Sequence, residues 1–171
     1  IMRKKTPILL ALCVLCVLLV WYLWPRSLSD TFPSFSKADS VTHCSATLVP
    51  SDPGSGLSTR QVELATDSQE YQQLVELLTS TRYLRNPTDL VRLGQASSTQ
   101  SITLEAYTAT ISFYQGKTIS SITLYGSQVV TEGGSDTRSY FPLAGRDFQT
   151  QVVQFLQDCS NATDITSASR S

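Results

Sequence analysis

One uninterrupted apolar run constrains this chain more than any other feature of its sequence. The run extends over 17 residues, from Ile8 to Trp24, and contains no charged residue. A helix of this length measures about 25 Å, which is near the short end of what crosses a hydrocarbon core of about 30 Å. Because a helix satisfies its backbone hydrogen bonds internally, an apolar helix is stable in lipid. We therefore expect residues 8–24 to form a single transmembrane anchor.

The residues that flank the run give the anchor a direction. Basic residues occupy positions 3–5 before it, whereas Arg26 alone follows it closely. The positive-inside rule then places residues 1–7 in the cytoplasm and the rest of the chain outside the cell membrane. A cleaved signal peptide and a lipid attached at Cys13 are the alternatives. The bulky Trp-Tyr-Leu-Trp end of the run favours a retained anchor over signal cleavage.

The remainder of the chain is polar and mildly acidic. The formal net charge is -1, although three of the 13 basic residues precede the anchor. Nucleic-acid binding is therefore excluded, because it requires clustered basic residues, and a polybasic membrane-binding face is disfavoured. The single histidine, His43, excludes multi-histidine metal sites and two-histidine mechanisms. We expect no cofactor and no bound metal.

Composition divides the segment after the anchor into three parts. Residues 25–40 are rich in Ser and Pro and predict a stalk. Residues 41–159 carry regular patterns of apolar residues and predict one extracytoplasmic domain. Residues 160–171 predict a polar C-terminal tail.

Apolar periodicity predicts an α+β fold for the extracytoplasmic domain. Six segments alternate with the period of a strand, and two follow the period of a helix. Their order is β-β-α-β-β-β-β-α, which favours an antiparallel sheet packed by two helices, with the sheet's other face open to water. Asp67 and Glu70 predict a capping box at the start of the first helix. The expected strands are 41–49, 61–65, 101–114 with a bend near Ala106, 118–125, 129–132 and 137–143, and the expected helices are 68–83 and 146–158.

The four cysteines fall into two pairs. Cys13 and Cys16 lie within the apolar run, where we interpret them as small apolar helix residues. Cys44 and Cys159 are the only two in the exported part, and an oxidising compartment favours their pairing. A disulfide between them would close a loop that contributes about 4–5 kcal/mol in the chain-entropy model. The sequence therefore predicts a Cys44–Cys159 disulfide.

No motif predicts catalysis. His43 and Cys44 are adjacent in a strand and so point to opposite faces, which makes His43 a surface histidine on an edge strand. Gly116-Lys117-Thr118 matches the end of a phosphate-binding loop but lacks its first glycine, and predicts a hairpin turn. An S-x-x-K motif at 34–37 falls in the stalk. A catalytic carboxylate pair has the candidates Glu63, Glu105, Glu132, Asp136 and Asp147, although no spacing selects two of them.

The general plan ends in a hairpin and a helix that contain Tyr140-Phe141, Phe148 and Phe155-Leu156. Together with the basic start, the anchor and the Ser/Thr-rich stalk, it resembles small membrane-anchored extracytoplasmic domains of unknown function from Gram-positive bacteria. The resemblance implies a location but no activity. We expect a non-catalytic binding or interaction module whose open sheet face meets a protein or a cell-wall ligand. A surface hydrolase with paired carboxylates and an accessory subunit of a membrane complex are the alternatives.

Overall fold

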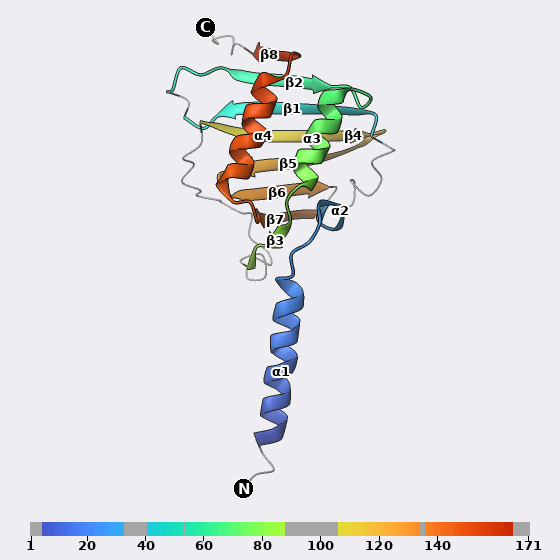
Figure 1. Cartoon of the computed structure of the whole chain (residues 1–171), viewed down its shortest axis with the longest axis vertical. Helices are drawn as coiled ribbons and strands as arrows, with labels where there is room; N and C mark the ends of the chain where they lie inside the picture. Colours follow the sequence, from blue (N-terminus) through green and yellow to red (C-terminus); the bar gives the residue numbers. More distant parts are fainter. Residues whose placement is uncertain (1–4, 33–40, 53, 88–105, 134–135, 166–171) are drawn as a thin grey trace.

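The computed structural model describes residues 5–32, 41–52, 54–87, 106–133 and 136–165. They form one antiparallel sheet with two helices on one face, while a third long helix points away from the sheet (Figure 1). The α+β class is therefore confirmed. The helices are α1 (Lys5–Tyr22), α2 (Leu28–Thr31), α3 (Gln69–Thr79) and α4 (Arg146–Asp158). The strands are β1 (His43–Pro50), β2 (Thr59–Leu64), β3 (Tyr83–Arg85), β4 (Tyr107–Gln115), β5 (Thr118–Tyr125), β6 (Gln128–Gly133), β7 (Asp136–Pro142) and β8 (Ala162–Ile165).

The sheet has eight strands within the described residues, so the expected number of six is wrong. Their order is β3-β7-β6-β5-β4-β1-β2-β8, and every pair is antiparallel. All six expected strands are present, and β3 and β8 are added at the two edges. β3 lies where the first helix was expected to end, and β8 lies in the expected polar tail. Both are too short to show a period of their own, so pairing with β7 and β2 decides their conformation.

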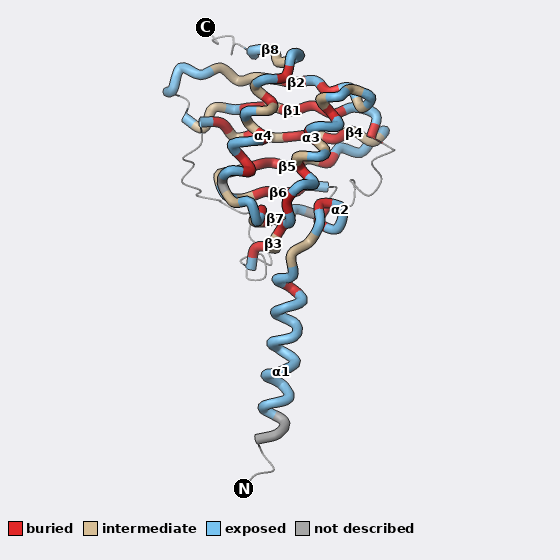
Figure 2. Tube along the Cα trace, in the orientation of Figure 1, coloured by how far each residue is buried: buried red, intermediate tan, exposed pale blue. Residues whose placement is uncertain are grey.

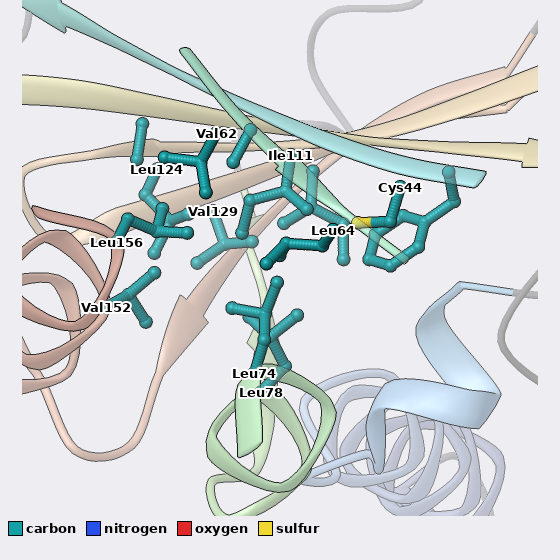
Figure 3. Packing of buried hydrophobic residues seen from close by; sticks show 14 of the residues in the cluster. Cys44, Val62, Leu64, Leu74, Leu78, Ile111, Leu124, Val129, Val152 and Leu156 are labelled. Carbon is teal, nitrogen blue, oxygen red and sulfur yellow. The ribbon is translucent and has the colours of Figure 1, made fainter. Parts of the chain in front are cut away.

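The core lies between the sheet and the two helices on its covered face (Figure 3). Leu74 and Leu78 of α3 and Val152 and Leu156 of α4 are fully buried there. They pack toward strand residues that alternate inward, such as Ile111 of β4. Burial follows the middle of the strands in Figure 2, whereas the outer turns of the helices are exposed. One face of the sheet is therefore covered, and the other has no helix on it in the described part of the chain.

Local capping explains where the helices begin. The side chain of Ser68 accepts a hydrogen bond from the backbone N–H of Tyr71 at 3.1 Å, so the cap of α3 is one residue later than the expected capping box at Asp67. α4 begins at Arg146, as predicted. The residue before it, Gly145, has φ 63°, a left-handed conformation that favours glycine.

The helix expected from the apolar run is α1, but it ends at Tyr22 rather than at Trp24. Its side chains from Ile8 to Trp21 are exposed on all sides, with exposed fractions that include 71% for Ile8 and 54% for Leu15. Of the residues that the structure describes, none form a helix that is both long and apolar enough to cross a membrane. The full span expected over residues 8–24 is therefore not found. The helix ends at Tyr22, which is 9% exposed against the domain, and Pro25 three residues later prevents its continuation.

Part of the expected stalk is folded into the domain. It contains the short helix α2, and both Leu28 and Phe32 belong to the core, each with 2% of the residue exposed. The ring of Phe32 lies 5.9 Å from the ring of Phe113 on β4. Residues 33–40 lie outside the described part of the chain. The core of the domain therefore includes residues that the composition alone placed in a linker.

Candidate functional site on the open sheet face

The open face of the sheet carries an array of uncharged polar side chains. Strand register places hydroxyls of neighbouring strands side by side, and Thr110 Oγ1 lies 3.2 Å from Thr123 Oγ1. One row across the sheet consists of Thr163, Gln61, Thr47, Thr110, Thr123, Val130 and Ser139. The adjacent row consists of Glu63, Ser45, Ser112, Ser121, Glu132 and Thr137. Ser45 and Thr123 are buried, at 8% and 7% exposure, whereas Thr47, Thr110, Ser112 and Ser121 are partly exposed. The accessible part of the face therefore presents hydroxyls that both donate and accept hydrogen bonds, with little charge.

His43 forms a polar cluster at one border of this array. Its Nε2 contacts a carboxylate oxygen of Glu63 on β2, and the other oxygen of that carboxylate accepts a hydrogen bond from Gln61 Nε2. The ring of Tyr114 on β4 lies 5.3 Å from the imidazole ring. The side chains of His43 and Glu63 are each about half exposed. The cluster therefore joins three neighbouring strands and is accessible to a ligand from the solvent.

The position of His43 differs from the expectation in one respect. Its side chain is on the surface, and Cys44 beside it points into the core, as strand geometry requires. However, β1 pairs with both β2 and β4, so His43 lies on an interior strand rather than on an edge strand. This placement surrounds the imidazole with side chains from both neighbouring strands.

Of the candidate carboxylates, the two described on the open face do not lie within reach of each other. Glu63 and Glu132 share one row of the open face, but four strand spacings separate them, which is about 19 Å. Paired carboxylates in glycoside hydrolases are about 5–9.5 Å apart. Asp147 is exposed on α4, in the helix layer. Glu105 and the side chain of Asp136 lie outside what the structure describes.

The remaining motif fragments supply no site. Gly116 has φ 60° in the turn between β4 and β5, as a hairpin turn requires. The S-x-x-K segment at 34–37 lies outside the described residues. In the part of the chain that the structure describes, no group of three or more His, Cys, Asp or Glu side chains is arranged to hold a metal ion.

All four cysteines lie in the described part of the chain, and all four are free thiols. The expected Cys44–Cys159 disulfide is therefore not formed in this structure. Cys44 is on β1, whereas Cys159 follows α4 and precedes β8, and the intervening strand β2 separates β1 from β8. Burial raises the pKa of the Cys44 thiol to about 12. Cys159 donates its S–H to the backbone oxygen of Phe155 at 3.3 Å, and burial also raises its pKa.

A second polar region lies where α1 meets the sheet. The hydroxyl of Tyr22 donates to the backbone oxygen of Asn86 at 3.4 Å, and the guanidinium of Arg85 lies 4.9 Å from the Tyr22 ring centroid. Arg26 and Tyr83 exchange two backbone hydrogen bonds of 2.9 Å each. Arg26 and the aromatic residues at the end of the apolar run were evident in the sequence. Their contacts with β3 were not predicted.

No family model, no curated protein and no solved structure matches this chain. The architectural resemblance to small Gram-positive extracytoplasmic domains therefore remains an expectation from sequence. Any functional conclusion has to be drawn from the geometry of the chain's own residues.

Proposed function

We propose that this chain is a non-catalytic binding module held on the outer face of a cell membrane by α1. The proposed ligand, an extracytoplasmic protein or a cell-wall component, binds to the open face of the sheet. The observation that carries this proposal is the segregation of the two faces. Both long helices of the domain lie on one face, and the other face combines two rows of hydroxyls with the His43–Glu63–Tyr114 cluster.

The chemistry of the open face favours binding over catalysis. Its imidazole is held by Glu63, and its described carboxylates are too far apart to act as a pair. Hydroxyl, amide and tyrosine side chains provide adaptable hydrogen bonds and one rigid ring at the edge of the array. Such a surface matches the hydrogen-bonding groups of a glycan or of a polar protein surface.

The anchoring role of α1 is supported by its exposed side chains. A helix that is apolar on all sides has no polar face to present to water, and α1 extends away from the domain (Figure 1). The orientation with the domain outside follows from the basic residues before the run. Trp21 and Trp24 lie at the domain end of the apolar run, as expected for a membrane interface.

Site-specific crosslinking tests the proposed binding face. We expect a photo-reactive residue at Thr110, in the middle of the hydroxyl array, to form a ligand adduct in native membranes. The same probe at Gln151, an exposed position on α4, is the matched control and should form none. A Thr47→Arg substitution on the neighbouring strand should block the Thr110 adduct, because Thr47 is only partly buried and the larger side chain occupies the face beside the probe. Adducts that form at Gln151 but not at Thr110 would contradict the proposal.

A charge in the middle of α1 tests the proposed anchor. We expect Leu15→Arg to release most of the chain from lipid vesicles in a flotation assay. An arginine at the centre of a membrane helix costs about 3 kcal/mol, which corresponds to a loss of roughly a hundredfold in the bound-to-free ratio. Leu15→Val keeps the helix apolar and should float like the unchanged protein. Equal flotation of all three proteins would argue against membrane insertion of α1.

A further inference from the structure

Three arginines gather where α1 joins the domain. Arg26 follows α1, and its two backbone hydrogen bonds to Tyr83 place it beside β3. Arg82 immediately precedes β3, and Arg85 is its last residue. These are three of the seven cationic residues in the described segments after α1, the others being Arg60, Lys117, Arg138 and Arg146. The mild acidity of the whole domain therefore hides a local concentration of positive charge.

Two exposed apolar side chains, Trp24 and Leu143, lie close to these arginines along the chain or through the backbone. Trp24, two residues before Arg26, is 62% exposed. Leu143, which directly follows β7, is 54% exposed. The backbone N–H of Leu143 donates to the backbone oxygen of Arg82 at 2.8 Å, so Leu143 belongs to the same end of the sheet. We call the set of Trp24, Arg26, Arg82, Arg85 and Leu143 the basal rim. It combines guanidinium groups with apolar and aromatic side chains, as a membrane interface requires.

One carboxylate lies within the charge of the basal rim. Asp30 in α2 has a lowered pKa, chiefly because Ser27 donates hydrogen bonds to its carboxylate, with smaller effects from Arg26 and Arg82. Asp30 therefore stays ionised at neutral pH and offsets one of the three positive charges. The net charge of the three arginines and Asp30 remains positive.

The connection between α1 and the sheet is direct. Tyr22 at the end of α1 is buried against the domain, and Arg85 stacks on its ring. In Figure 1 the strands run across the axis of α1, with β3 nearest to the helix and β8 farthest from it. Seven strand spacings separate these two edges, which is about 33 Å. A membrane that holds α1 would therefore lie against the basal rim and far from β8.

We propose that the basal rim rests on the bilayer that holds α1 and binds the phosphate groups of anionic lipids. The inference rests on the proposed function, since it requires α1 to be in a membrane. Guanidinium groups bind phosphate through paired, charge-assisted hydrogen bonds. Trp24 and Leu143 enter the interface beside them. The sheet then stands upright, with β3 at the lipid surface and the open face accessible from the side rather than covered by the membrane.

Paramagnetic lipids test this orientation on the full chain. The isotope-labelled protein is placed in lipid nanodiscs of phosphatidylcholine with phosphatidylglycerol, and a gadolinium chelate is attached to a fraction of the headgroups. We expect the amide signals of Tyr83 and Leu143 to broaden strongly, whereas those of Thr163 and Asp164 on β8 remain sharp. In nanodiscs of phosphatidylcholine alone the difference should be smaller, because the phosphatidylglycerol charge is absent.

Matched substitutions identify the role of the arginines. Arg82→Gln should lower the ratio of docked to undocked domain about fivefold, since each basic residue near an anionic surface contributes about 1 kcal/mol. Lys117→Gln removes the same charge at the distant β4–β5 turn and should change nothing. Arg82 is chosen because Arg26 and Arg85 also contact Trp21 and Tyr22.

The outcomes separate this inference from the anchor itself. A chain that is retained in nanodiscs but shows equal broadening at β3 and β8 would overturn the docked orientation and leave the anchor intact. Identical behaviour of Arg82→Gln and Lys117→Gln would overturn the role of the arginines in lipid binding. A chain that does not associate with nanodiscs at all would overturn both the inference and the proposed anchoring by α1.

Discussion

Replacing Phe32 by alanine is expected to destabilise the domain by about 3–5 kcal/mol. Phe32 lies in a segment that its composition assigns to a flexible stalk, yet it is 2% exposed and packs against Phe113 in the core. Removing a buried aromatic ring loses its apolar burial and leaves a cavity that the surroundings fill only partly. The measurement is equilibrium unfolding of the full chain in urea, with α1 held in detergent micelles.

The matched control for this prediction is Ile119→Ala. Ile119 is on the open face and is 56% exposed, so its truncation should change the free energy of unfolding by no more than about 0.5 kcal/mol. The midpoint of the Phe32→Ala protein should fall while the slope of the transition stays unchanged. If the two variants unfold at the same urea concentration, the segment around α2 is not part of the core.

The burial of α2 also determines how the protein should be prepared for binding experiments. A soluble piece that begins at residue 41 lacks both Leu28 and Phe32, which are buried in the core. A piece that ends at residue 159 also lacks β8, which pairs with β2. Failure of such a piece to bind a partner would therefore reflect its missing core rather than the properties of the open face.

The domain is expected to lose stability steeply above about pH 9 under reducing conditions. Burial raises the pKa of Cys44 from 9.0 to about 12, so the folded thiol keeps its proton in a range where the unfolded thiol releases it. The unfolded state then binds fewer protons, and the free energy of unfolding falls as the pH rises. The contribution of the Cys44 thiol to the free energy of unfolding is complete below pH 9. Above pH 9 this contribution falls by about 1.4 kcal/mol per pH unit, or by about 4 kcal/mol in total at pH 12.

Other buried groups act in the same direction. Burial also raises the pKa values of Cys159, Tyr71 and Tyr83. The free energy of unfolding should therefore fall with pH more steeply than one group alone would cause. Cys44→Ala should reduce the slope by about 1.4 kcal/mol per pH unit, whatever it does to stability at neutral pH. Ile119→Ala removes no ionisable group and should leave the dependence of the free energy of unfolding on pH unchanged. A Cys44→Ala protein with the unaltered slope would show that this thiol is not buried in the fold.

Local periodicity was enough to predict most of the elements. The second long helix of the domain begins and ends where the apolar pattern predicted, and all six expected strands are present. A bend occurs at Ala106, where the apolar residues were expected to change face, although residues 101–105 lie outside the described part. These features are encoded within a few residues of each other, because side chains repeat with the period of the element that carries them.

The candidate site was only partly visible in the sequence. The alternation of β1 placed His43 on the open face and Cys44 in the core, and both positions are confirmed. The partnership of His43 with Glu63 and Tyr114 was not predicted, because it joins three strands whose register the sequence does not state. The abundance of Ser and Thr was evident, but only strand pairing aligns them in rows across the sheet.

The sequence by itself determined the apolar run, the order of the main elements and which face of each strand is apolar. Only the tertiary structure decided that α2 enters the core and that β3 and β8 extend the sheet. It also decided that Arg26 meets Arg82 and Arg85 at the basal rim. The physical reason is that periodicity is a property of neighbouring residues. Edge pairing, burial of a short segment and the gathering of charge depend on contacts between residues far apart in the chain.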